Sequence, residues 1–462
     1  MADFDLCVIG SGTGNTIITR RLADWRCAIV DGQKWFGGTC LNVGCIPTKM
    51  FVYPADVIES ARHAAELGVR FGQPQVSWDA IRDRIFSRID PIAESGEECR
   101  AGQDNVALFR EQARFVGPKT LQVGSQRFTA DRFVLAAGSR PRIPDVPGLD
   151  DPALADRVHT SDDIMRLPSL PKSLIIVGGG FIAAEFAHIF ASYGTQVTVL
   201  HRGSRLLRTA DADVSDRFTN LLSKRVVLRL GQHLAAVEGT EYGLEVGTID
   251  DDGVEYSFAA EHLLLATGRV PNGDTLDLHR TGVEVDEDTG LVRVDEFQRT
   301  TADGIFALGD VSSPWQLKHV ANHEARVVQH NLVHPHDPIA SDHRFVPKAV
   351  FSGPQVAWVG LTEADCAAQG LDYAVGVRDY GGVAYGWAME DEDHFAKVLV
   401  ERPTGRLLGG HIIGPNASIL IQPVIQALSF DLPAAELTRG QYWIHPALTE
   451  VVENAVLDAA AR

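Results

Sequence analysis

Two cysteines with four residues between them, Cys40 and Cys45, stand in the glycine-flanked segment 37–49. This spacing is longer than the short knuckles of structural zinc sites, and no second pair of ligands follows nearby. Pro47 is typical of the first turn of a helix, which we expect to run to about Ala61. Because a helix N-terminus favours the thiolate form, the pair is predicted to supply reactive thiols. Two buried, inert cysteines are the alternative.

His445 and Glu450, near the other end of the chain, form a candidate acid–base pair. Reduction of a disulfide expels a thiolate with a pKa of about 8.5, which leaves more readily when it is protonated. An imidazole, with a pKa of about 6.5 that a neighbouring carboxylate raises, can supply that proton. Pro446 is expected to open a helix from which Glu450 turns back towards the ring. The remaining histidines show no spacing that calls for a metal.

Segment 6–31 has the pattern of a βαβ dinucleotide-binding unit. Apolar strands are expected at 6–9 and 27–30, with a helix through Ala23 between them. Glycines in the turn let the backbone approach a pyrophosphate, which then lies at the positive end of the helix. Asp31 follows the second strand, where a carboxylate binds ribose hydroxyls and repels a 2′-phosphate, so we expect FAD here. The predicted contacts are Gly10, Gly12, Gly14 and Asp31, with Asn15 in place of the usual third glycine.

Segment 174–208 repeats this pattern with a different ending. Strands are expected at 174–177 and 196–200, and the helix between them ends at Tyr193. Arginines follow the second strand instead of a carboxylate, and arginine binds phosphate through two parallel hydrogen bonds. The unit is therefore predicted to bind NADPH through its 2′-phosphate, two solvated surface arginines being the alternative. The predicted contacts are Gly178, Gly180, Ala183, Arg202 and Arg208.

A second pair of repeats lies between and after these units. The sequence Leu-Ala-Ala-Gly-Ser-Arg-Pro at 135–141 recurs at 265–271 as Leu-Ala-Thr-Gly-Arg-Val-Pro, and each is typical of a strand that ends in a glycine turn. A helix is expected from Gln316 to about Leu332, and the region from Ser341 onwards has an α+β pattern. Within it we expect strands at 357–360 and 411–414 and helices at 417–430 and 447–460.

The predicted fold class is α/β, with two Rossmann-like dinucleotide-binding domains and a C-terminal α+β dimerisation domain. The FAD domain is expected in two parts, 1–150 and 271–338. The NADPH domain is expected at 151–270 and the interface domain at 339–462.

The composition, with 45% apolar and 22% charged residues, is that of a soluble globular protein. The net charge of −19 disfavours nucleic acid and anionic membranes as partners, because both bind basic patches. No apolar run suits a transmembrane helix, and the N-terminus, which already has a strand pattern, leaves no room for a signal peptide. Six scattered cysteines do not suit a secreted disulfide framework. A cytoplasmic enzyme is therefore expected.

The order of the motifs, over essentially the whole chain, resembles the FAD-dependent pyridine nucleotide–disulfide reductases, a family that includes glutathione reductase and lipoamide dehydrogenase. The resemblance is carried by segment 37–49, both dinucleotide units, segment 301–310 and His445-Pro446. It implies that electrons pass from NADPH through FAD to a Cys40–Cys45 disulfide and then to a small disulfide substrate. It also implies a homodimer whose active sites are completed across the two-fold axis.

The resemblance also implies a role for each matching residue. Cys40 resembles the thiol that attacks the substrate, and Cys45 resembles the thiol that faces the flavin. Lys49, paired with Glu185, resembles the lysine beside the flavin ring, and Asp310 resembles the carboxylate on the ribitol chain. Further cofactor contacts are expected at Gly38, Thr39, Ala113, Gly138 and Gly268.

Segments 45–53, 384–390 and 440–448 most resemble family members that reduce the disulfide of a glucosaminyl-inositol thiol. Trp443 would present an aromatic face to such a sugar, and packing at a dimer interface explains it equally well. Lipoamide and glutathione disulfide stay open as substrates. A transhydrogenase-like flavoprotein would lack the cysteine pair, and a non-catalytic redox sensor would not need Glu450 beside the histidine.

Overall fold

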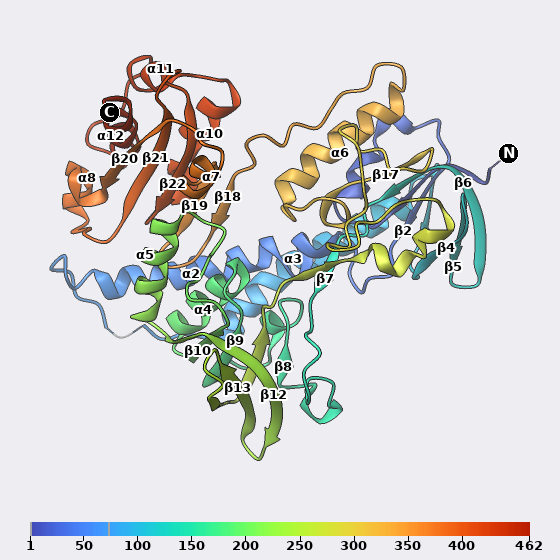
Figure 1. Cartoon of the computed structure of the whole chain (residues 1–462). Coiled ribbons are helices and arrows are strands. Elements are labelled where there is room, and N and C mark those ends of the chain that lie inside the picture. The colour runs from blue at the N-terminus through green and yellow to red at the C-terminus, as the bar shows by residue number, and fades with distance from the viewer. Residues whose placement is uncertain (1, 73) are drawn as a thin grey trace. The chain divides into compact units, whose positions relative to one another are not determined.

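The computed structural model describes residues 2–72 and 74–462 and divides into two compact units (Figure 1). Each unit is assembled from segments that lie far apart in the sequence. The first unit contains the residues up to Thr48 together with 80–142 and 268–343, and the second contains 49–79, 143–267 and 344–462.

The first unit is built on a sheet whose strand order is β3-β2-β1-β6-β5-β4, with β17 paired to β6. Strands β3, β2, β1, β6 and β17 run parallel, whereas β4 and β5 extend the sheet as an antiparallel hairpin. Near-continuous apolar runs such as that of β2 are typical of parallel strands covered on both faces. The strands are β1 (Phe4–Ile9), β2 (Cys27–Val30), β3 (Val106–Phe109), β4 (Ala113–Gly117), β5 (Thr120–Val123), β6 (Gln126–Leu135) and β17 (Ile305–Ala307).

The α-helix expected through Ala23 is wrong, because the chain there forms two short 3-10 turns, Thr13–Ile17 and Arg20–Leu22. The side chain of Thr16 donates to the Thr13 carbonyl at 2.7 Å, and Arg100 donates to the Asn15 carbonyl at 2.6 Å. Each of these two carbonyls thus accepts a hydrogen bond from a side chain. The β-branched run that follows Asn15 also has a low helix propensity.

The two repeated glycine segments meet in the first unit. Strand β7 (Ser139–Pro141) pairs antiparallel with β16 (Arg269–Pro271), so each segment supplies one strand of a small ribbon. Arg140 closes the ribbon with a two-point ion pair to Asp274 at 2.7 and 2.9 Å. The helix expected from Gln316 is confirmed as α6 (Lys318–Val333).

The second unit contains a parallel sheet of order β11-β10-β9-β15-β8. The expected helix ending at Tyr193 is confirmed as α4 (Phe181–Tyr193), and Gly194 ends it in the left-handed conformation. The other elements are β8 (Val158–His159), β9 (Ser173–Val177), β10 (Gln196–His201), α5 (Ala212–Ser223), β11 (Val227–Leu230), β15 (His262–Leu265) and the antiparallel strands β12 (Gln232–Thr240), β13 (Gly243–Asp250) and β14 (Glu255–Ala260).

The C-terminal part of the second unit is an antiparallel sheet of order β18-β19-β22-β21-β20 with helices packed on it (Figure 1). Helix α12 lies on β20 so closely that a side chain at Gly376 would collide with the Ala455 carbonyl. The elements are β18 (Lys348–Val350), β19 (Val356–Gly360), α7 (Glu363–Ala368), β20 (Tyr373–Asp379), α8 (Ala384–Ala388), β21 (Phe395–Glu401), β22 (Leu407–Ile413), α9 (Ala417–Leu420), α10 (Gln422–Ser429), α11 (Ala434–Arg439) and α12 (Thr449–Ala460).

Two further expectations for the C-terminal part need correction. The helix expected at 417–430 is divided into α9 and α10, and Pro446 does not open the last helix, which begins at Thr449. The reason is local, because the Glu450 carboxylate accepts the Ala447 amide at 3.2 Å and holds the residues before the helix in a turn. Among the described residues, no helix has the length and apolarity needed to cross a membrane.

Candidate functional site

The cysteine segment consists of two consecutive helices, α1 (Gly38–Asn42) and α2 (Cys45–His63). Cys45 is the first residue of α2, which confirms its predicted place at a helix N-terminus, and its side chain is exposed. Cys40 is half-buried and lies inside α1 rather than just before a helix. Asn42 is the last residue of α1. Its buried side chain stabilises the start of that helix by donating to the carbonyls of Phe36 and Gly38 at 2.9 and 3.0 Å.

Three of the remaining cysteines are poor competitors for redox chemistry because they are buried. Burial raises the pKa of Cys27 and that of Cys366 to about 11, and it raises the pKa of Cys7 further. Since the thiolate is the nucleophile, these groups stay unreactive at neutral pH. The number of candidate redox cysteines is thereby reduced, which favours Cys40 and Cys45.

The first glycine turn and the cysteine segment touch through their backbones. Gly38 has φ of +76°, and a Cβ atom there would lie 2.7 Å from the Cα atom of Gly12. The Ser11 hydroxyl accepts the Gly37 amide at 2.7 Å, which joins the same two segments by a hydrogen bond. Only glycine permits this approach, so the cysteines are held at a fixed place beside the turn that was predicted to bind pyrophosphate.

The first dinucleotide unit fits FAD in its donor and acceptor groups. Asp31 is 6% exposed, and its carboxylate accepts the amides of Ser11 and Gln33, both at 2.8 Å. Lys318 was not predicted, and its ammonium donates to the Thr13 hydroxyl at 2.7 Å, which places a cation beside the glycine turn. Gly10 has no space for a side chain because a Cβ atom would collide with the Ala136 carbonyl.

The other predicted contacts for FAD are Thr39 on α1, Gly14 in the first turn and Ala113 on β4. A side chain at Gly14 would lie 2.5 Å from that of Ala136, so the position is closely packed. Ala113 is 8% exposed and packs in the core of the sheet, which leaves only its backbone for a ligand. Roles for these residues stay predictions.

Asp310 is held by a network that sequence analysis did not find. The Ser139 hydroxyl donates to its carboxylate at 2.6 Å, and Arg269 donates to that hydroxyl at 2.7 Å and to the Ser139 carbonyl at 2.8 Å. Gly138 and Gly268 precede Ser139 and Arg269, and a side chain at either glycine would meet nothing within 4 Å. The sequence feature that could have revealed this network is the repeat of the glycine segments, because Ser139 comes from one of them and Arg269 from the other.

The pairing of Lys49 with Glu185 is confirmed. The Lys49 ammonium lies 2.7 Å from both carboxylate oxygens of Glu185, which is 3% exposed and also accepts the Phe351 amide at 2.9 Å. The ammonium also lies 4.8 Å from the centre of the Phe351 ring. Because Lys49 follows Cys45 on helix α2, the cation and the exposed thiol are presented by one rigid element.

In the glycine turn of the second dinucleotide unit, one glycine is closely packed and another is open. A side chain at Gly178 would collide with the Ala266 carbonyl, whereas a side chain at Gly180 would meet nothing within 4 Å. Gly180 is the N-cap of α4, and the buried Ala183 lies in the first turn of that helix. Arg202 and Arg208 are both exposed, which is compatible with phosphate binding and with the alternative of two solvated surface arginines.

His445 and Glu450 form the predicted pair. The Nδ1 atom of His445 lies 2.8 Å from the Glu450 carboxylate, and the hydrogen bond between them lowers the pKa of Glu450. The His445 side chain is 72% exposed, and the neighbouring Tyr442 and Ile444 are exposed as well. Trp443 instead packs against the core of the C-terminal sheet and donates to the Thr438 carbonyl at 3.2 Å. These contacts lie within the chain itself, so they bear out neither a sugar-binding face nor packing at a dimer interface for Trp443.

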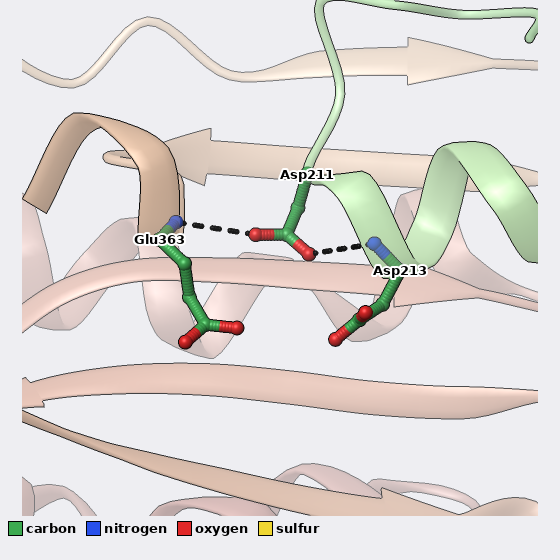
Figure 2. A group of neighbouring side chains, drawn as sticks. All are labelled: Asp211, Asp213 and Glu363. Carbon is green, nitrogen blue, oxygen red and sulfur yellow. Dashed lines mark hydrogen bonds between the residues drawn. The ribbon is translucent and has the colours of Figure 1, made fainter. Parts of the chain in front are cut away.

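Three carboxylates, those of Asp211, Asp213 and Glu363, lie close enough together to suggest a metal site (Figure 2). All three accept from the ammonium of Lys397, at 2.7 Å for each of the two aspartates. Burial would lower the pKa of Lys397, but the hydrogen bonds to the carboxylates outweigh burial and raise it. A cation of the chain itself therefore fills the centre of this cluster and ties α5, α7 and β21 together.

The pyridine nucleotide-disulphide oxidoreductase family matches residues 4–325, and its dimerisation domain matches residues 346–456. The chain belongs to this family. It is 52% identical to mycothione reductase from Mycobacterium tuberculosis, over 99% of both chains. It is 33% identical to glutathione reductase from Burkholderia cepacia, over 97% of both chains, and 32% identical to dihydrolipoyl dehydrogenase from Vibrio cholerae, over 96% of this chain and 93% of that one.

Among solved structures, the HOCl-induced flavoprotein disulfide reductase RclA from Escherichia coli matches with a TM-score of 0.85 and 27% identity, over 98% of this chain and 99% of that one. The predicted α/β fold class is confirmed, and the chain is a flavoprotein disulfide oxidoreductase. As a member of this FAD-dependent family it uses a nicotinamide dinucleotide, and it carries the family's dimerisation domain.

We expect Glu450→Gln to lower kcat by about tenfold or more with little change in KM, because an amide at this position no longer stabilises a protonated imidazole. His445→Ala should lower kcat by roughly 10²- to 10⁴-fold, the usual contribution of a general acid. Steady-state kinetics with a saturating dinucleotide measure both. Glu436→Gln, an exposed change on α11, is the control. A Glu450→Gln enzyme with unchanged kcat would remove the carboxylate from the mechanism.

Proposed function

We propose that the chain reduces mycothione, the disulfide of mycothiol, to two molecules of mycothiol with NADPH. The observation that carries the proposal is the 52% identity to mycothione reductase over 99% of both chains. The relatives named for glutathione and dihydrolipoyl substrates are only 32–33% identical over similar lengths. The reaction consumes one disulfide, one NADPH and one proton, and yields two thiols and NADP⁺.

In this proposal the chain's own residues carry out the thiol exchange. The Cys40 thiolate attacks one sulfur of the substrate, and the departing thiolate takes a proton from His445, which Glu450 orients at 2.8 Å. Cys45 then attacks Cys40 in the mixed disulfide, which releases the second thiol and forms the Cys40–Cys45 disulfide. FAD, when bound, passes the two electrons of NADPH to that disulfide.

Different residues would bind different parts of FAD. Asp31, Lys318 and the glycine turn of the first unit would bind the dinucleotide part, and Asp310 would bind the ribitol chain. Lys49 would lie beside the flavin ring with Glu185 as its counterion. The Lys49 charge is paired with the buried Glu185 carboxylate at 2.7 Å.

The exposure around His445 supports a homodimer with composite active sites. A proton donor that is 72% exposed in one chain, next to exposed Tyr442 and Ile444, is typical of a group covered by a partner. The dimerisation domain of the family spans this region. We propose that His445 serves Cys40 of the partner subunit. A cytoplasmic location, inferred from the cysteine usage, stays a prediction.

The substrate proposal is tested by following NADPH oxidation with mycothione, glutathione disulfide and lipoamide under one set of conditions. We expect mycothione, or a truncated glucosaminyl-inositol analogue, to have the highest kcat/KM, because a site that hydrogen-bonds hydroxyl groups rejects analogues that lack them. Glutathione disulfide or lipoamide with an equal kcat/KM would contradict the substrate and leave the disulfide reductase activity intact.

The dinucleotide preference is tested at the exposed arginines. Arg202→Ala and Arg208→Ala should each lower kcat/KM for NADPH by about ten- to a hundredfold, because hydrogen bonds between charged groups are strong. The kcat/KM for NADH should stay nearly unchanged. Arg205→Ala is the matched control, since Arg205 lies in the same loop and faces Asp216 at 3.5 Å. Equal losses with both dinucleotides would mean that the arginines do not distinguish them.

The composite site is tested by mixing two inactive chains. Cys40→Ser and His445→Ala homodimers should both be nearly inactive, whereas a co-expressed mixture contains heterodimers with one intact site. Activity should therefore return in the mixture, in proportion to the heterodimer measured by differential tags. Confirmed heterodimers without activity would place the thiol and its acid on the same chain.

A further inference from the structure

The two dinucleotide units share one backbone hydrogen bond, from the first glycine of the turn to the end of the second strand. This bond shows which positions of the two units are equivalent. In the first unit the Gly10 amide donates to the Val30 carbonyl at 2.8 Å. In the second, the Gly178 amide donates to the Leu200 carbonyl at 3.0 Å. The residue after Val30 is Asp31, and the residue after Leu200 is a histidine. His201 is therefore equivalent to Asp31. In units that bind a dinucleotide without a 2′-phosphate, a carboxylate at this position binds the ribose.

The His201 ring lies against the glycine turn of its unit, as the Asp31 side chain lies against that of the first unit. Asp31 accepts the amide of Ser11, the residue after the first glycine of its turn. A Cβ atom at Gly179, the equivalent residue of the second turn, would lie 2.5 Å from the Nδ1 and Cε1 atoms of His201. A Cβ atom at Gly203 would lie 2.8 Å from Nε2. Two glycines thus leave the space in which the ring lies.

The Nε2 atom of His201 is buried and has no hydrogen-bond partner among the residues that the structure describes. Buried polar atoms of folded proteins are nearly always paired, so an unpaired one at a predicted ligand site indicates a partner supplied by the ligand. The predicted 2′-phosphate site supplies such a partner, since phosphate oxygens accept strong hydrogen bonds.

The charges around the ring favour its neutral form in the free protein. Burial lowers the pKa of His201, the positive charges of Arg202 and Arg208 lower it further, and a hydrogen bond with the Arg205 backbone acts in the opposite direction. The register partner of His201 on β11 is Leu230, and the turn beside the ring consists of Gly178, Gly179 and Gly180, so none of these residues brings a charge to it. A phosphate dianion bound by the arginines would reverse this balance and favour the imidazolium.

We propose that His201 is a third, proton-dependent ligand of the 2′-phosphate, which takes up a proton when the 2′-phosphorylated dinucleotide binds. The inference rests on the proposed use of NADPH and extends it, because a neutral imidazole in the free protein becomes a cation only when the phosphate is present. Binding of NADPH thereby becomes linked to pH, whereas binding of NADH does not.

The proposal is tested by calorimetric binding of 2′,5′-ADP and 5′-AMP to the FAD-loaded enzyme at pH 7.5, in two buffers of different ionisation enthalpy. His201→Gln should weaken 2′,5′-ADP by about tenfold and leave 5′-AMP unchanged. The wild-type protein should take up more protons than His201→Gln on binding 2′,5′-ADP. The ligand's own phosphate titrates in both proteins, so it cancels in this difference. His233→Gln, an exposed histidine bound to Asp251, is the matched control.

Further variants distinguish failure of the proposed role of His201 from failure of NADPH use. His201→Glu restores the carboxylate that the first unit has in Asp31, so it should lower kcat/KM for NADPH and raise it for NADH. Unchanged affinity and proton uptake in His201→Gln, with Arg202→Ala losing 2′,5′-ADP, would overturn the role of His201 and leave NADPH use intact. Equal binding of 2′,5′-ADP and 5′-AMP by the wild-type protein would overturn NADPH use itself. If His201→Gln fails to retain flavin, the same measurements on His201→Asn decide the outcome.

Discussion

The close approach of two glycine backbones, Gly12 and Gly38, is the constraint on which the placement of Cys40 and Cys45 depends. One belongs to the dinucleotide turn after β1, and the other begins the short helix that carries Cys40. The hydrogen bond from the Gly37 amide to Ser11 fixes the same contact. A Cβ atom on Gly38 would force the segments apart, and the thiols would lose their fixed position beside the cofactor turn. Reduction of a disulfide by a bound flavin requires such a fixed position.

The two dinucleotide units differ in the residue at one equivalent position, Asp31 in the first and His201 in the second. Asp31 is a buried carboxylate held by two backbone amides, which suits ribose hydroxyls. His201 in the second unit is followed by Arg202, so this unit offers a protonatable ring and a fixed cation instead. The chain as a whole has a net charge of −19, and this local cationic site therefore stands out against an acidic background. The same fold is thereby adapted to FAD and, as proposed, to NADPH.

The sequence predicted the features that depend on local patterns and missed those that depend on contacts between distant segments. Helix α4 was predicted to its last residue because its apolar run ends at a glycine. The helix expected through Ala23 was wrong, and the bond from Arg100, far along the chain, to the Asn15 carbonyl is a contact that the local pattern does not reveal. Ser139 and Arg269 were missed for the same reason, since nothing in either segment alone reveals that they meet at Asp310. The pairing of His445 with Glu450 was predictable because a proton-donating imidazole needs a carboxylate that orients it, whereas the roles of Cys40, Cys45 and His445 stay predictions.

The central claim is that NADPH opens a disulfide between Cys40 and Cys45, and mapping the thiols that NADPH generates tests it most directly. The enzyme is first oxidised with its disulfide substrate and freed of it, then given one equivalent of NADPH without oxygen, denatured in iodoacetamide and mapped by mass spectrometry. Before NADPH, we expect the Cys40 and Cys45 peptides to be joined and the other four of the six cysteines to be alkylated. After NADPH, all six should be alkylated. Cys40 and Cys45 already alkylated before NADPH, with no new thiols after it is consumed, would contradict the account.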